Sequence, residues 1–204
     1  MTVFKTSLSI RTHEDADPAV ATPLQAVRSG MGMVPNMYGA MANLPALLDT
    51  YNHGYAKFRA EGGFTPVEQE VVFLAISRFN GCHYCVAAHS FVADQLSKVP
   101  TEVTDAVRDG RPIPNARLEA LRLFTHQMTE SRGNPTPAQV EAFLGAGFTE
   151  GHILAIVLAI SVKVISNYAN HIFHTELDIA FSRRAWTPPA NDAGQALERT
   201  SEPA

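Results

Sequence analysis

Helix-start and helix-stop signals recur along this sequence, whereas the alternating apolar and polar pattern of strands hardly appears. Thr65-Pro66 combines an N-cap residue with proline at the first helical position, and Thr136-Pro137 repeats the combination. Apolar residues at helical spacing follow these starts, and Asn80-Gly81 is typical of a helix end. The pattern predicts an all-α fold with helices over these ranges: 18–28, 45–60, 66–80, 82–98, 100–109, 115–130, 137–145 and 149–178.

The length and composition favour one globular domain. The chain has 204 residues, of which 46% are hydrophobic and 18% are charged, so it can bury a core and lacks the bias of a disordered protein. We predict a single helical domain over residues 21–184, preceded by an N-terminal extension over residues 1–20. Residues 185–204 are rich in Pro, Ala, Asn and Ser and are predicted to form a C-terminal tail.

Charge and hydropathy restrict the partners that we expect. The net charge is -4, and Lys and Arg are scattered, so no nucleic-acid partner is predicted. The N-terminus lacks the features of a signal peptide, which favours a cytoplasmic location. The most apolar stretch, Ile153 to Ile165, is too short to span a bilayer and contains Lys163. We therefore predict no membrane span, and expect this stretch to be buried in the core or between subunits of a homo-oligomer.

Four residues that carry reactive side chains fall within one short part of the chain. Cys82 and Cys85 are three residues apart, so a helix places both on one face. His89 follows four residues after Cys85 on the same stripe and can act as its base or ion-pair partner. Glu70 lies on the preceding predicted helix, and a chain reversal at Asn80-Gly81 can bring its carboxylate back over the other three. The sequence thus predicts one site that holds a carboxylate, an imidazole and two thiols.

This set of groups is suited to redox chemistry at sulfur. A thiolate can take an oxygen atom from a peroxide and become a sulfenic acid, and a second thiol then condenses with it to a disulfide. Cys85 is favoured as the attacking sulfur because His89 lies one turn away. Cys82 stays open as the alternative, because a helix that begins there places its positive dipole end beside that thiol.

The spacing of these residues resembles the alkylhydroperoxidase D and carboxymuconolactone decarboxylase superfamily, and more narrowly its peroxidase-related members. The resemblance implies a helical bundle of the alkylhydroperoxidase D type that forms homo-oligomers and reduces hydroperoxides with a dithiol or protein reductant. It implies no cofactor and no metal, and it assigns the catalytic roles to Glu70, Cys82, Cys85 and His89. The residues that carry it are Val34-Pro35-Asn36, Leu44-Pro45, Glu70, Cys82-x-x-Cys85 and His89.

One position departs from the family pattern. Alkylhydroperoxidase D has a histidine directly before the second cysteine, where this chain has Tyr84. His83 is displaced by one residue, which is about 100° around a helix. We predict that Tyr84 and His83 lie in or near the pocket, and that Tyr84 tunes the site without carrying protons, because a phenol is a poor base at neutral pH.

Two other functions are compatible with the same residues. The cysteine pair can serve general thiol–disulfide exchange. Alternatively, Cys82 and Cys85 with His171 and His174 can supply four zinc ligands in a structural oligomer that has no turnover. We expect His171 and His174 instead to cap or pack the end of the last helix. Four methionines are expected to fill gaps in the core: Met31, Met33, Met37 and Met41.

Overall fold

A computed structural model describes residues 3–189, and this part of the chain contains only helices and connecting segments, without a strand. The predicted all-α class is therefore confirmed. Each of the predicted helices is present, with small shifts at the ends. The elements are α1 (Pro18–Met31), α2 (Asn36–Met41), α3 (Pro45–Glu61), α4 (Pro66–Phe79), α5 (His83–Gln95), α6 (Thr101–Asp109), α7 (Ala116–Glu130), α8 (Pro137–Gly145), α9 (Glu150–Phe173) and the 3-10 helix η1 (Ile179–Arg184).

Local capping explains why the helix starts could be predicted. Thr65 accepts a hydrogen bond from the Glu68 amide, and the Glu68 carboxylate accepts one from the Thr65 amide, so α4 begins with a complete capping box. Thr136 and Gln139 form the same reciprocal pair at the start of α8. These contacts span only three residues, so a short sequence pattern is enough to specify them.

Two helix predictions need correction. The last helix ends at Phe173, not near Asp178, because His174 adopts a left-handed conformation with φ 48°. The Thr175 amide then closes the turn by donating to the Asn170 carbonyl at 3.1 Å, as expected for a helix C-terminus. The short helix α2 was not predicted, and it begins immediately after Pro35. Both differences lie beside the site described below.

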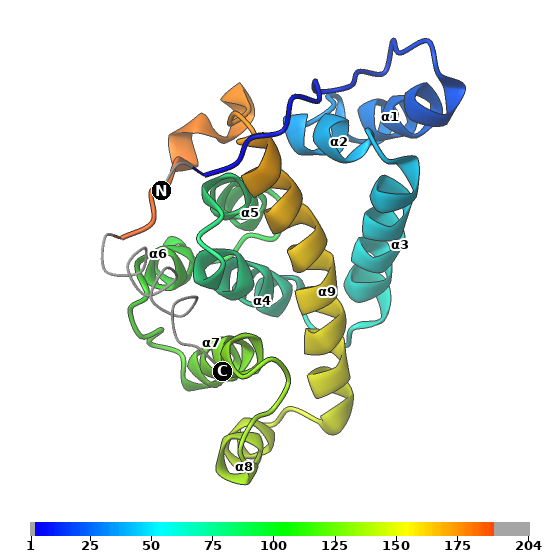
Figure 1. Ribbon diagram of the computed structural model, residues 1–204. Helices are drawn as coiled ribbons and strands as arrows, with labels where there is room; N and C mark the ends of the chain where they lie inside the picture. The colour runs from blue at the N-terminus through cyan, green and yellow to red at the C-terminus, as the bar shows by residue number, and fades with distance from the viewer. Residues whose placement is uncertain (1–2, 190–204) are drawn as a thin grey trace.

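Helices α4 and α9 form the centre of the molecule. Helix α4 packs against α5, α6, α7 and α9, and most of its residues are buried. Helix α9 also packs against α3, which runs beside it in Figure 1, and against α2, which lies near its C-terminal end. The chain reverses between α4 and α5 at Gly81, whose φ of 66° favours glycine. The Asn80 side chain donates to Asn167 of α9 at 2.8 Å and fixes this reversal to the central helix.

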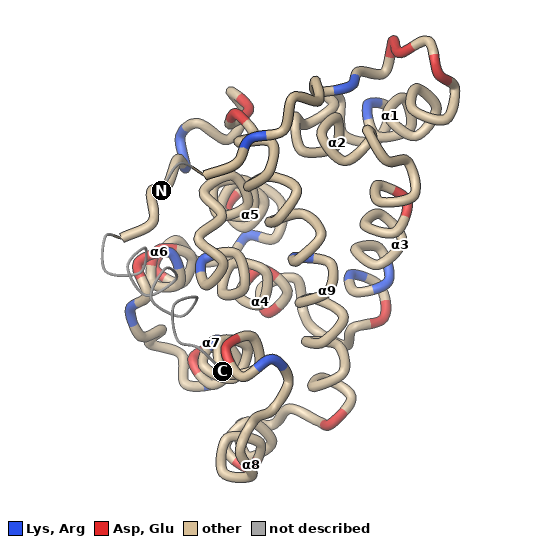
Figure 2. Tube along the Cα trace, viewed as in Figure 1, with Lys and Arg blue, Asp and Glu red and all other residues tan. Residues whose placement is uncertain are grey.

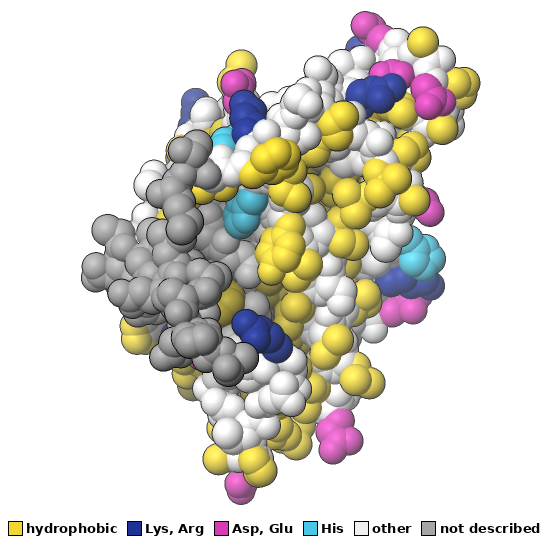
Figure 3. All heavy atoms as spheres, in the orientation of Figure 1, with side chains coloured by type: hydrophobic (Ala, Val, Ile, Leu, Met, Phe, Trp, Pro, Cys, Tyr) yellow, Lys and Arg dark blue, Asp and Glu magenta, His cyan; other side chains and the backbone are white. Residues whose placement is uncertain are grey.

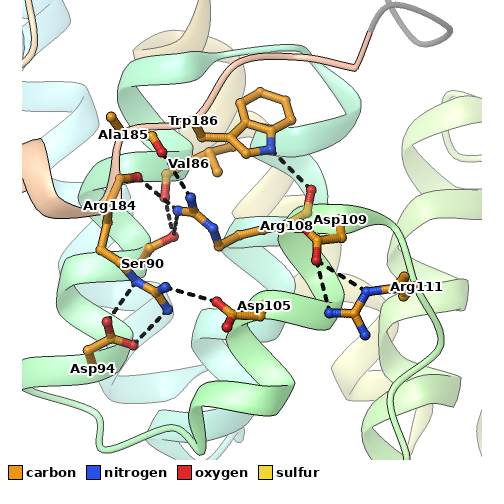
Figure 4. A network of polar contacts seen from close by, with 10 residues as sticks. All are labelled: Val86, Ser90, Asp94, Asp105, Arg108, Asp109, Arg111, Arg184, Ala185 and Trp186. Atoms are coloured by element: carbon orange, nitrogen blue, oxygen red, sulfur yellow. Dashed lines mark hydrogen bonds and ion pairs between the residues drawn. The ribbon is translucent and has the colours of Figure 1, made fainter.

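The end of η1 and the segment after it are tied to α5 and α6 by a network of arginine contacts (Figure 4). Arg108 of α6 donates to the Ser90 hydroxyl of α5 at 2.7 Å and to the Arg184 carbonyl at 2.9 Å. Arg184 in turn pairs with Asp94 of α5 at 2.7 Å. The Trp186 indole donates to the Arg108 carbonyl at 3.1 Å. This network holds α5, the helix that carries the cysteines, from the outside.

The domain boundaries remain predictions. Residues 3–17 are mostly exposed, and two backbone contacts join them to the helices: the Thr6 amide donates to the Ile172 carbonyl and the Arg11 amide to the Gly39 carbonyl. Most of the predicted C-terminal tail, residues 190–204, lies outside the described residues. Lys and Arg positions are interspersed with Asp and Glu positions along the described trace (Figure 2), as the mild net charge suggests.

Helix α9 has two different sides. By length and composition alone it is the one described helix that could cross a membrane, but it packs in the core of the bundle, and Lys163 at its centre is buried. Its other side exposes apolar residues, and hydrophobic side chains run over it in Figure 3. This side borders a groove of about 640 Å³ between α7 and α9. The exposed apolar residues are Leu154, Val157, Tyr168 and Ile172.

Candidate active site

The two cysteines lie together at the start of α5. Cys82 is the N-cap residue and Cys85 lies in the first turn, and their side chains approach to 3.5 Å without forming a disulfide. Both are buried, with exposed fractions of 0% and 1%. The three-residue spacing therefore places the sulfurs close enough to exchange a proton or to form a bond after a small adjustment.

Glu70 and His89 face each other across the α4–α5 pair. The Glu70 Oε2 atom lies 2.9 Å from His89 Nδ1, so the reversal at Gly81 brings these two predicted residues together. Two residues that were not predicted hold the other oxygen, Oε1. Arg59 of α3 pairs with it at 2.5 Å, and the Ser97 hydroxyl donates to it at 3.2 Å. The carboxylate is thus satisfied on both oxygens although it is fully buried.

This pair has defined protonation states at neutral pH. Burial raises the pKa of Glu70. The hydrogen bond with His89 and the Arg59 charge lower it by more, so the pKa of Glu70 lies below the ordinary value. Burial and the Lys163 charge lower the pKa of His89 to about 4. Because the carboxylate can only accept, His89 Nδ1 carries the proton, and Nε2 is then the basic nitrogen.

The two thiols differ in their tendency to ionise. Burial raises the pKa of the Cys85 thiol, but the hydrogen bond from Cys82 and the Lys163 charge hold it well below the usual range. Burial and the neighbouring Cys85 raise the pKa of the Cys82 thiol. The Asn170 amide adds to the difference, because its Nδ2 lies 3.3 Å from the Cys85 sulfur and 3.9 Å from the Cys82 sulfur. This asymmetry favours a thiolate on Cys85 over the alternative on Cys82.

A polar stripe on α9 covers the cysteine pair, and sequence reasoning missed it. Its members are fully buried and share one helix face at spacings of three, four and seven residues: Lys163, Ser166, Asn167 and Asn170. The Ser166 hydroxyl lies 3.9 Å from the Cys85 sulfur. Four polar residues at helical period inside an otherwise apolar helix are a signal that could have identified this stripe from the sequence.

A small cavity of about 60 Å³ adjoins the thiols, and most of its lining is apolar or aromatic. Met31 and Met37 border it. Met37 is a core residue, as expected, but the expectation is wrong for Met31. Met31 is 52% exposed and is not a core residue. The cavity is lined by Met31, Pro35, Met37, Tyr38, Tyr51, Tyr55, Tyr84, Cys85, Ala88, His89, Val92, Lys163 and Phe181.

The remaining predicted residues separate into different positions. Tyr84 lines the cavity, and its hydroxyl donates to the Asp178 carboxylate and accepts from the Met37 amide at 3.4 Å. His83 is half-buried and is not among the lining residues. His171 lies in the last turn of α9 and His174 is its C-cap residue, in the positions expected for packing and capping.

The zinc alternative finds no geometric support in the described part of the chain. Over residues 3–189, no group of three or more His, Cys, Asp or Glu side chains is arranged to hold a metal ion. The cysteines instead have their nearest polar contacts with each other and with the amide and hydroxyl groups of α9.

Solved structures share this fold. An uncharacterised peroxidase-related protein from Ralstonia eutropha, with an alkylhydroperoxidase D core, matches with a TM-score of 0.75 and 24% identity, over 85% of this chain and 93% of its own. A peroxidase-related protein from a Silicibacter species matches with a TM-score of 0.72 and 22% identity, over 89% and 97%. The debrominase Bmp8, in complex with 2,3,4-tribromopyrrole, matches with a TM-score of 0.71 and 15% identity, over 88% and 97%.

The sequence comparison identifies a family segment that contains the site. No protein with a curated description matches the chain. Residues 44–125 match the carboxymuconolactone decarboxylase family, and this range includes Glu70, Cys82, Cys85 and His89 but not the stripe on α9. The chain is thus similar to this family over residues 44–125, and it shares the fold of the solved structures over 85% or more of its length.

Proposed function

We propose that this protein is a thiol peroxidase that reduces organic hydroperoxides or hydrogen peroxide. The observation that carries the proposal is the buried cysteine pair, 3.5 Å apart, beside the hydrogen-bonded pair of Glu70 and His89. A thiol peroxidase needs a thiolate, a second thiol within reach of it and a group that manages protons. Cys82, Cys85 and His89 lie within the first two turns of α5, and Glu70 lies on the adjoining face of α4.

The cycle begins at Cys85. Its thiolate attacks the outer oxygen of the hydroperoxide, the O–O bond breaks, and the sulfur becomes a sulfenic acid. The alkoxide that leaves takes up one proton and departs as an alcohol, or as water when the substrate is hydrogen peroxide. Cys82 then attacks the Cys85 sulfur, which forms the disulfide and releases water. An external dithiol supplies two electrons and two protons to restore the reduced pair.

Glu70 and His89 manage the proton in this cycle. With Nδ1 held by the carboxylate, Nε2 can take up a proton and pass it to the departing oxygen, because Cys85 reacts as a thiolate and has no proton to give. Glu70 stabilises the positive imidazole while the proton resides there, and Arg59 keeps the carboxylate ionised. Tyr84 is not required for the transfer, because its hydroxyl is bound to Asp178.

The cavity indicates which peroxides fit. Its apolar and aromatic lining favours a small organic hydroperoxide whose hydrocarbon part can displace water. The reductant must be a dithiol, either a small molecule or a partner protein, and the cytoplasm maintains such thiols in the reduced form. We therefore propose a cytoplasmic antioxidant role. General exchange with large protein disulfides is less well supported, because both sulfurs are buried.

The test combines turnover with thiol counting. Reduced protein should show two free thiols, and one equivalent of cumene hydroperoxide should remove both while one equivalent of alcohol forms. Cys85→Ser should abolish turnover, and Cys82→Ser should stop after one equivalent with a sulfenic acid. His53→Gln, an exposed position on α3, serves as the matched control. Survival of both thiols in excess peroxide would contradict the proposal.

A further inference from the structure

Lys163 is a buried ammonium group without a hydrogen-bond acceptor. Its exposed fraction is 0%, and Nζ has no hydrogen-bond partner within residues 3–189. The contact recorded for Nζ is the face of the Phe73 ring, 5.6 Å from the ring centroid. An isolated charge in a protein interior is costly, and such charges are usually paired. A nearby anion would therefore stabilise Lys163, and the contact with the Phe73 ring does not provide one.

The charged groups around the cavity leave one source for that anion. Glu70 is already paired with Arg59 at 2.5 Å, and His89 is neutral above a pKa of about 4. Burial raises the pKa of each tyrosine in the lining, so their phenols stay neutral. The titratable or charged groups that face this region are Tyr38 of α2, Tyr51, Tyr55 and Arg59 of α3, Glu70 of α4, and Cys82, Tyr84, Cys85 and His89 of α5. The nearby Asp178 carboxylate already accepts from the Tyr84 hydroxyl and the Asn36 amide, so a thiolate is the group that remains to balance Lys163.

The geometry selects Cys85 over Cys82 as that thiolate. Lys163 and Cys85 line the same cavity, whereas Cys82 does not. Ser166 and Asn170 lie one and two turns further along the same face of α9, and they contact the Cys85 sulfur at 3.9 Å and 3.3 Å. We propose that the Lys163 ammonium is the counter-ion of the Cys85 thiolate, and that it is a positioning residue that holds the reduced pair ready to react.

A redox consequence follows from this charge balance. In the reduced protein, Lys163 and the Cys85 thiolate neutralise each other. When the disulfide forms, Cys85 loses its negative charge and Cys82 loses its thiol proton, so Lys163 remains as a buried cation without an anion. Reduction of the disulfide by two electrons and one proton restores the pair, so Lys163 favours the reduced form and makes the disulfide more oxidising. The inference uses the cysteine pair of the proposed function, but it holds for any oxidant and does not require peroxide.

The decisive variant is Lys163→Met, which removes the charge at similar side-chain length. We expect the pKa of the Cys85 thiol, measured by thiolate absorbance, to rise by about 1–3. Alkylation by iodoacetamide at pH 7 should slow by about tenfold or more. In dithiothreitol redox buffers, each tenfold loss of the reduced form corresponds to about 30 mV toward more negative potential. Lys57→Met, an exposed lysine on α3, is the matched control and should change none of these readouts.

A stability measurement separates this role from a structural one. The variant should raise the urea midpoint of the oxidised protein, because it removes a buried cation that has no anion in that state. A lysine that only supports packing would lower the midpoint in both redox states. Unchanged thiol titration in a folded variant would overturn the proposal. So would failure of both Lys163→Met and Lys163→Gln to fold. If Lys163→Met changes the thiol titration as expected but the parent protein does not turn over peroxide, only the proposed function is overturned.

Discussion

His89 should control how the protein responds to mild acid. In the unfolded chain its imidazole takes up a proton below a pKa of about 6.5, but in the folded protein only below about 4. Between these values the unfolded state binds more protons, so the free energy of unfolding falls as the pH falls. Each pH unit corresponds to 1.36 kcal/mol, which gives about 2 kcal/mol lost at pH 5 relative to pH 7, and about 3 kcal/mol at pH 4. The side chain is only 6% exposed, so solvent screens this contribution little.

The assay is urea unfolding followed by circular dichroism at pH 7 and pH 5, on reduced protein. His89→Gln keeps a donor for Glu70 but cannot take up a proton, so it should lose about 2 kcal/mol less than the parent protein over this interval. His53→Gln, which changes an exposed histidine, should retain the parent pH dependence. The low pKa of Glu70 adds acid sensitivity only below about pH 4.5, outside the interval. Equal pH dependence in the parent and His89→Gln would refute the reasoning.

Three further predictions concern the surroundings of the site and the outer face of α9. Tyr84→Phe should retain most peroxide turnover but lose about 1–2 kcal/mol in urea unfolding, because Asp178 loses a buried hydrogen bond; a loss of turnover comparable to Cys85→Ser would make Tyr84 essential. Asn170→Leu should slow alkylation of Cys85 about tenfold at pH 7, because the thiolate loses its amide donor, and an unchanged rate would contradict that role. Light scattering should show an oligomer of the 22.2 kDa chain that Leu154→Glu dissociates, because Leu154 is 71% exposed on the apolar side of α9; a parent protein that is monomeric at micromolar concentration would exclude this.

The fold could be predicted wherever local contacts determine it. The start of α4 depends on a threonine and a glutamate three residues apart, so Thr65 and Glu68 are visible as a pattern. The end of α9 could not be predicted in this way. His174 takes a left-handed conformation that usually favours glycine, and nothing local in the sequence marks it. Helix α2 has only six residues, too few for a helical period to be recognised.

The candidate site shows the same division between short and long sequence separation. Glu70 and His89 lie on helices joined by a tight reversal, so their meeting could be inferred from the spacing and from Gly81. Lys163 and Asn170 reach the cysteines from a helix about eighty residues further along the chain, and their approach depends on tertiary packing. Their helix is apolar overall, and this pattern predicts that the helix is buried without indicating that it has a polar face.

The complete burial of both sulfurs determines how quickly this centre can respond to its surroundings. A bulky thiol can reach the buried sulfurs only when side chains that line the cavity, such as Tyr38 and Met37, move aside. The rate of that movement then limits the rate of exchange with bulky thiols, whereas small peroxides can reach the sulfurs without it. A disulfide between the two cysteines should therefore be reduced more slowly by bulky thiols than by small ones.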